Sequence, residues 1–183
     1  NRIREKLREH GCDGILLYDP VNIRYAFDSS NMAVRTAHNA TPYALILAEG
    51  PGIMFEFAGC EHLNDGLPAI DEIRNARSWI YLISGEHVAE HAGKWADEIA
   101  DVLAAGRTRR RLAVDKLEPL GVHALERRGV EIVEGQELTE RARSIKSADE
   151  LALMRWTIRV CEAGMARMYE VSEPGRTERE IWA

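Results

Sequence analysis

The feature that most constrains the fold is an alternation of short apolar runs with amphipathic stretches, which stops near residue 145. Short apolar runs bounded by Gly, Pro or Asp predict buried strands, and apolar residues recurring every third or fourth position predict helices. Strands that alternate with helices are typical of an α/β domain. The predicted strands are 14–18, 43–48, 52–57, 78–83, 111–115 and 130–133, and the predicted helices are 1–10, 22–27, 87–105, 118–129 and 136–144.

The pattern changes at the stretch 144–147, beyond which only helices are predicted. Ser147 and Glu150 form a capping box at the start of a long helix, and Thr177 and Glu180 form a second one. We therefore expect a domain of residues 1–145, followed at 146–183 by the start of another domain. A helix that is capped and then ends after about six residues has no length to offset its own nucleation. We expect the chain to be a piece of a longer polypeptide.

Charge and composition exclude several classes of protein. The 183 residues carry a formal net charge of -6, and the isoelectric point is about 5.6. An acidic chain is a poor general ligand for nucleic acid or for an acidic membrane surface. No apolar stretch approaches the roughly 18 residues that a membrane-spanning helix needs. The three cysteines are far apart and odd in number, which favours reduced thiols in the cytoplasm over a disulfide framework.

Two pairs of metal-ligand residue types occur, and neither predicts a metal site. His87 and His91 lie four residues apart on a predicted helix, but no third ligand follows at a recognisable spacing. We interpret them as part of a solvated helix start. Adjacent residues point to opposite faces of a strand, and on a short helix Cys60 and His62, two positions apart, diverge, so a buried cysteine beside a surface histidine is the better interpretation. No phosphate-binding glycine loop and no nucleophile motif is present.

The connection between the first two predicted strands is the strongest candidate for function. It reads DPVNIRYAFDSSNMAVRTAHN and carries Asn31, Arg35, His38 and Asn39 within a stretch of no predicted secondary structure. Long connections of this kind are usually functional or disordered, and Met32 and other apolar residues disfavour disorder. Two interpretations stay open. The loop packs on its own domain, or it faces a ligand or a partner.

Three stretches resemble the pita-bread metalloenzymes, which include creatinase, prolidase and Xaa-Pro aminopeptidase. The first is DP followed by NIRY at 19–25. The second is RSIKS at 143–147, with Glu150 and the pair 154–155, at the junction where the catalytic half of such enzymes begins. The third is PG, TE and EI within 174–181. The stretches DPVNIRYAFDSSNM, RRLAVDK, RARSIKSADE and EIWA are most similar to the dimethylsulfoniopropionate lyase branch of this family.

The resemblance implies a creatinase-type N-terminal α/β domain, a mixed sheet flanked by helices, followed by the first helices of a catalytic domain. It also implies two divalent ions (Mn, Fe, Zn or Co), held by carboxylates and a histidine beyond this chain. A homodimer is implied, in which the N-terminal domain of one subunit borders the cleft of the other. Asn31, Arg35 and His38 would then face the neighbour's small zwitterionic substrate, an Xaa-Pro dipeptide or dimethylsulfoniopropionate.

One departure from the family pattern and one alternative function accompany this interpretation. Peptidases of the group have a glycine after their YxT element, where this chain has Phe27, Asp28, Ser29 and Ser30. This difference weakens the proline-peptidase interpretation. The alternative is a stand-alone, non-enzymatic interaction module derived from the same domain. No residue of this chain is predicted to be catalytic or to bind metal.

Overall fold

The structure is a computed structural model that describes residues 2–30, 42–104 and 110–182. The chain divides into two compact units, Asn1–Arg143 and Ser144–Ala183, which are described separately. None of the helices in the described ranges is both long and apolar enough to cross a membrane.

The first unit is built on a six-stranded sheet in the order β4-β3-β2-β1-β5-β6. Antiparallel pairing joins β2 to β1 and β3, and the other neighbours are parallel. Five strands therefore run in one direction and β2 runs against them. The strands are β1 (Gly14–Leu17), β2 (Tyr43–Leu47), β3 (Gly52–Glu56), β4 (Glu72–Asn75), β5 (Arg111–Val114) and β6 (Glu131–Glu134).

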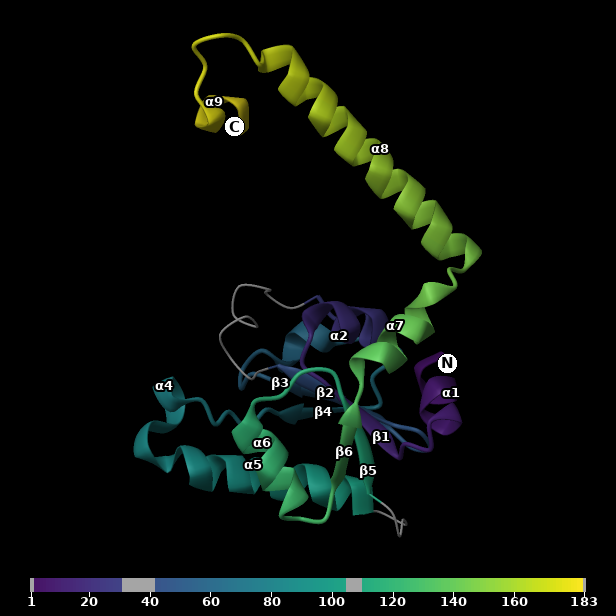
Figure 1. Cartoon of the computed structure of the whole chain (residues 1–183), viewed down its shortest axis with the longest axis vertical. Coiled ribbons are helices and arrows are strands. Elements are labelled where there is room, and N and C mark those ends of the chain that lie inside the picture. The colour runs from purple at the N-terminus through teal and green to yellow at the C-terminus, as the bar shows by residue number, and fades with distance from the viewer. Residues whose placement is uncertain (1, 31–41, 105–109, 183) are drawn as a thin grey trace. The chain divides into compact units, whose positions relative to one another are not determined.

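Helices cover both faces of this sheet. Trp95 and Ile99 of α5 (Val88–Ala104) and Leu125 of α6 (Pro119–Glu126) belong to the core on one face. The core on the other face is completed by α1 (Arg2–Glu9), α2 (Pro20–Phe27) and α7 (Gln136–Ser144). Figure 1 shows α5 and α6 on the side of the sheet opposite α2. The predicted α/β fold with a mixed sheet flanked by helices is confirmed.

The central strands form because their residues are apolar on both sides. Every residue of β1, β2 and β3 is buried. The sequence of such a strand is a continuous apolar run. It lacks the alternation of apolar and polar residues that is typical of a strand with one face in solvent. The edge strands β4 and β6 contain only one and two apolar residues, Ile73 and the pair Ile132 and Val133.

The predicted strand at 78–83 is wrong. The edge strand lies earlier, at Glu72–Asn75, and residues 81–84 form the short helix α4 (Tyr81–Ser84). Trp79 is buried in the core and contacts Trp95, with ring centroids 5.5 Å apart. The apolar residues of 78–83 therefore include one core residue, Trp79, and three exposed residues of α4. Two short 3-10 helices complete the unit, η1 (Glu61–Asn64) and η2 (Gly85–His87).

The second unit consists of α8 (Ala148–Val171) and α9 (Glu178–Trp182). The predicted capping box is present at α8, where Glu150 N–H donates to Ser147 Oγ (3.2 Å) and Ser147 N–H donates to Glu150 Oε2 (2.6 Å). No residue of α8 is buried. Its apolar stripe is therefore exposed along the described helix, with Met154, Ile158 and Met165 among its members.

Candidate functional site

The carboxyl ends of five strands meet at one edge of the sheet. After β1 the chain enters α2 on one face, and after β5 it enters α6 on the opposite face. Since β1 and β5 are parallel neighbours, the two connections leave the sheet in opposite directions, which makes this position a topological switch point. Ligands of open α/β sheets commonly bind at switch points of this kind.

A half-buried carboxylate joins the two connections at this switch point. Asp115 follows β5 and accepts hydrogen bonds from the backbone N–H groups of Tyr18 (2.8 Å) and Asp19 (3.1 Å) and from Asn22 Nδ2 (2.9 Å). Burial raises the pKa of Asp115, and the three hydrogen bonds oppose that rise. Asp19 itself caps α2 by accepting from Val21 N–H (2.8 Å). The strand end and the helix start are thereby held in one arrangement.

A second polar chain is buried further along the same edge. Ser29 Oγ donates to Asn64 Oδ1 (2.6 Å), and Asn64 Nδ2 donates to Glu56 Oε2 (2.8 Å). Each of these three residues is at most 4% exposed. Buried polar groups stay in a fold when they are hydrogen-bonded, and removing one partner leaves the others desolvated. The chain connects the residues after α2 with the end of β3 and with η1.

The predicted substrate-facing residues Asn31, Arg35 and His38 lie outside the described residues. The residues that flank this segment are described. Ser29 belongs to the buried polar chain, and β2 begins at Tyr43. Because β2 runs against its neighbours, its start lies at the same edge as the carboxyl ends of β1 and β3. Both flanks of the segment are thus at the sheet edge that carries the switch point.

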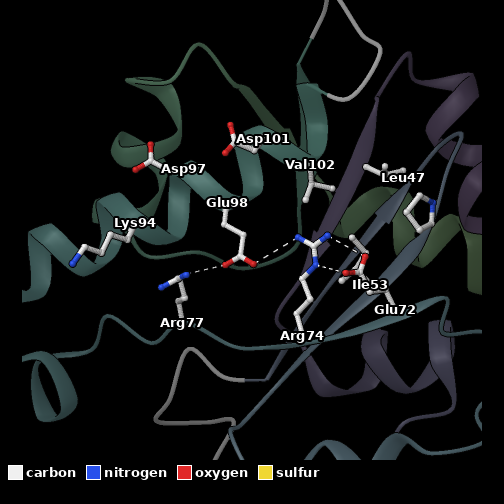
Figure 2. A pocket seen from close by; sticks show the side chains of 11 residues that line it. Leu47, Ile53, Glu72, Arg74, Arg77, Lys94, Asp97, Glu98, Asp101 and Val102 are labelled. Carbon is white, nitrogen blue, oxygen red and sulfur yellow. Dashed lines mark hydrogen bonds and ion pairs between the residues drawn. The ribbon is translucent and has the colours of Figure 1, made fainter.

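A large pocket lies elsewhere on the unit, between β4 and α5. Its volume is about 900 Å³, and Figure 2 shows Glu98 pointing between two arginines. Glu98 pairs with Arg77 at 2.9 Å and with Arg74 at 3.6 Å. Arg74 also pairs with Glu72 at 2.7 Å and lies over the Phe55 ring, 5.9 Å from its centroid. The apolar part of the lining is Leu47, Pro51, Ile53 and Val102.

Most of the charged side chains that line this pocket are ion-paired. Arg74 and Arg77 pair with Glu98, Lys94 pairs with Glu90, and Asp97 pairs with Arg128 outside the pocket. Among the described residues, no three His, Cys, Asp or Glu side chains lie close enough to hold a metal ion. His91 Nδ1 is 2.9 Å from Ser84 Oγ, and His87 Nδ1 is 3.3 Å from Glu90. Cys60 is half-buried at the start of η1.

Reasoning from the sequence missed Asp115, Glu56, Asn64 and the pocket. A signal existed for Asp115, because a carboxylate directly after a buried strand repeats the arrangement of Asp19 after β1. Glu56 ends β3 in the same way. Asn64 and the pocket had no local signal in the sequence. The hydrogen-bond partner of Asn64 and the residues that line the pocket come from separate parts of the chain.

The whole chain aligns with two curated proteins. It is 35% identical over 189 residues to the dimethylsulfoniopropionate lyase DddP of Roseovarius nubinhibens and 35% identical over 190 residues to DddP of Roseobacter denitrificans. The chain is homologous to the N-terminal region of DddP. It covers 42% of each DddP protein, less than half of its length. No protein-family model matches the chain.

Solved structures show the same fold at lower identity. The Xaa-Pro dipeptidase from Bacillus anthracis is 20% identical and has a TM-score of 0.67, with 98% of this chain and 44% of that chain covered. The N-terminal domain of the peptidase PepQ from Mycobacterium tuberculosis is 17% identical, with a TM-score of 0.51 over 77% of this chain and 95% of that one. The fold is therefore that of a prolidase N-terminal domain, as the creatinase-type resemblance implied.

Proposed function

We propose that the chain is the non-catalytic N-terminal domain of a two-metal enzyme that acts on a small zwitterion. In this proposal it forms a homodimer in the cytoplasm and borders the substrate cleft of the neighbouring subunit. The observation that carries the proposal is the 35% identity to DddP along the entire chain. Between the two parent activities, this identity favours dimethylsulfoniopropionate lyase over Xaa-Pro peptidase.

We propose that the role of the described residues is positioning, and that the two divalent ions (Mn, Fe, Zn or Co) bind in a catalytic domain that corresponds to the part of DddP this chain does not cover. The buried Ser29–Asn64–Glu56 chain and the Asp115 cluster fix the sheet edge at which the segment of Asn31, Arg35 and His38 begins and ends. We propose that Arg35 pairs with the substrate carboxylate through its planar guanidinium, and that Asn31 and His38 help to orient it.

The test of the parent activity uses the full-length protein that contains this chain, loaded in turn with Mn, Fe or Zn. Dimethyl sulfide release from dimethylsulfoniopropionate is compared with the hydrolysis of Xaa-Pro dipeptides. We expect release of dimethyl sulfide. Dipeptide hydrolysis in its place would favour the peptidase, and a folded, metal-loaded protein inert toward both would favour the stand-alone interaction module.

The test of the cleft role is Arg35→Ala in the same full-length protein. Loss of a hydrogen bond to a charged group should raise the activation free energy by about 1.5–3 kcal/mol, which lowers kcat/KM by roughly 10- to 150-fold. The melting temperature should stay unchanged. Wild-type kinetics, or a variant that does not fold, would contradict the role of Arg35.

A further inference from the structure

The chain contains two Asp–Gly sequences, Asp13–Gly14 and Asp65–Gly66, and no Asn–Gly sequence. An aspartate followed by glycine is prone to close into a succinimide ring, because glycine has no side chain to hinder attack by its backbone nitrogen. Ring closure also requires a backbone that can turn this nitrogen toward the carboxyl carbon of the aspartate. The way in which the fold holds each sequence therefore decides whether it reacts.

The first sequence, Asp13–Gly14, is locked into the sheet. Asp13 N–H donates to Arg111 O (2.8 Å), Asp13 O accepts from Ala48 N–H (2.9 Å), and Asp13 Oδ2 accepts from Arg111 N–H (2.8 Å). Gly14 begins β1 and is buried between β2 and β5. Rotation of the Asp13 backbone would break these hydrogen bonds in the middle of the sheet.

The second sequence, Asp65–Gly66, lies in an exposed turn directly after η1. Asp65 has a φ of -62° and a ψ of 132°, and Gly66 has a φ of +76°, which are the values of a type II turn. Leu67 N–H donates to Asn64 O across this turn at 3.4 Å, longer than the usual N–H···O distance of about 2.9 Å. The turn is therefore closed by one weak hydrogen bond.

Both reacting groups of this turn are unpaired. Within residues 2–30, 42–104 and 110–182, neither the Asp65 carboxylate nor the Gly66 N–H has a hydrogen-bond or ion-pair partner. Apart from its chain neighbours, no described atom lies within 4 Å of the position that a Cβ of Gly66 would take. The backbone nitrogen thus gives up no hydrogen bond and meets no obstacle when it turns toward the carboxyl carbon.

We propose that Asp65–Gly66 is an isoaspartate-forming modification site and that Asp13–Gly14 is not. The Gly66 nitrogen attacks Cγ of the protonated Asp65 carboxyl, and the carboxyl hydroxyl leaves with the N–H proton as water. Water then adds to the Asp65 backbone carbonyl carbon and breaks its bond to nitrogen. The main chain now runs through Cγ, and residue 65 carries a free α-carboxylate. Water is lost once and added once, so the net change is an isomerisation.

The modification would act on the buried polar chain at the sheet edge. Isoaspartate lengthens the main chain by one carbon directly after Asn64, which is 2% exposed. Asn64 accepts from Ser29 Oγ at 2.6 Å and donates to Glu56 Oε2 at 2.8 Å. A buried polar group that loses its partner is left desolvated, so displacement of Asn64 destabilises the fold. We expect the isoaspartate form to melt at a lower temperature than the unmodified chain.

The test is prolonged incubation of the folded 183-residue chain at neutral pH, followed by peptide mapping in which electron-transfer fragmentation locates isoaspartate. We expect isoaspartate at residue 65 and none at residue 13. In urea both sequences should isomerise, because unfolding releases Asp13 from the sheet. Equal accumulation at the two residues in the folded chain, or none at residue 65, overturns the proposal.

Two variants of Asp65 serve as controls. Asp65→Glu keeps the charge but would have to close a larger ring, so it should accumulate no isomer and keep its melting temperature on incubation. Asp65→Asn offers the same nitrogen a neutral amide, which leaves as ammonia, and should form isoaspartate faster than the wild type. Incubated wild type that melts like incubated Asp65→Glu, despite isoaspartate at residue 65, overturns the link to Asn64. These outcomes do not depend on the parent activity, which the dimethyl sulfide assay decides.

Discussion

Asn22 Nδ2 donates a 2.9 Å hydrogen bond to Asp115 Oδ2, although 93 residues separate the two. The contact joins the start of α2 to the end of β5 and so holds together the two helices that leave the sheet on opposite faces. It also gives a physical reason for the NIRY stretch, because its asparagine donates to a half-buried carboxylate and its isoleucine, Ile23, is buried in the core.

The pH dependence of stability should carry the signature of Asp115. Burial raises its pKa above the ordinary value of 3.8, so the folded protein holds this proton more tightly than the unfolded chain. The contribution of such a carboxyl to stability is greatest below pH 3.8 and falls as the pH rises through the raised pKa. The free energy of unfolding of the wild type minus that of Asp115→Asn should therefore increase as the pH is lowered from about 7 toward about 4.

Urea unfolding at a series of pH values measures this difference. Asp97 supplies a matched control, because its pKa is lowered by the hydrogen bond from Arg128. The stabilisation from that pair is present above the unfolded pKa of Asp97 and is lost as the pH falls through the lowered one. The wild type minus Asp97→Asn difference should accordingly stay level between about pH 7 and about pH 4 and shrink only on further acidification. If the two differences in unfolding free energy had the same dependence on pH, burial would not be what sets the pKa of Asp115.

Gly135 should be intolerant of alanine. A Cβ at this position would lie 2.7 Å from the carbonyl carbon and 2.8 Å from the nitrogen of Val114, and a strand backbone cannot move aside. Overpacking of this kind destabilises by about 1–3 kcal/mol. Gly93 of α5 is the control, since only the flexible end of Arg128 approaches its Cβ position, at 3.4 Å. Gly93→Ala should stabilise by about 0.5–1 kcal/mol through helix propensity. Chemical denaturation distinguishes the two, and an equal response would refute the packing argument.

Asp28 belongs to the stretch Phe27–Ser30 that stands where the resemblance implies a glycine in the peptidases, and its backbone is strained. Its φ is +59°, a left-handed value at the end of α2. Glycine adopts this conformation without strain, whereas other residues lose roughly 1 kcal/mol. Asp28→Gly should raise the free energy of unfolding by that amount, because the Arg24 pair it removes is exposed and 3.8 Å long. Asp28→Ala should not stabilise. A destabilised glycine variant in thermal melts would show that the aspartate side chain matters more than its backbone.

The first unit should fold by itself. Every buried hydrophobic residue of the described chain precedes residue 143, and α8 buries none of its side chains. A chain shortened to residues 1–143 should therefore keep the melting temperature of the 183-residue chain. Shortening to residues 1–129 removes β6 and the core residues Leu138 and Ala142 of α7, and should abolish cooperative unfolding. A lower melting temperature for the 1–143 chain would mean that α8 or α9 stabilises the first unit.

The sequence by itself determined the elements whose own residues carry the signal. The apolar runs of β1, β2 and β3 mark strands buried on both faces, the apolar stripe of α5 marks that helix, and the capping box marks the start of α8. These signals are local, because period and capping depend on residues a few positions apart. The family resemblance also rested on short local stretches, at 19–25, 143–147 and 174–181, and the DddP relatives confirm it.

Tertiary structure alone decided which surfaces the elements share. The edge strand β4 has one apolar residue and is a strand because β3 supplies its hydrogen-bonding partner. The run 78–83 looks like a strand, yet the core between α5 and α6 takes in Trp79 and leaves Leu82 in solvent. Asn22 and Asp115, like Ser29 and Asn64, meet only when distant segments close. Long-range contacts of this kind leave no periodic trace in the sequence, since their free energy depends on burial that exists only in the folded domain.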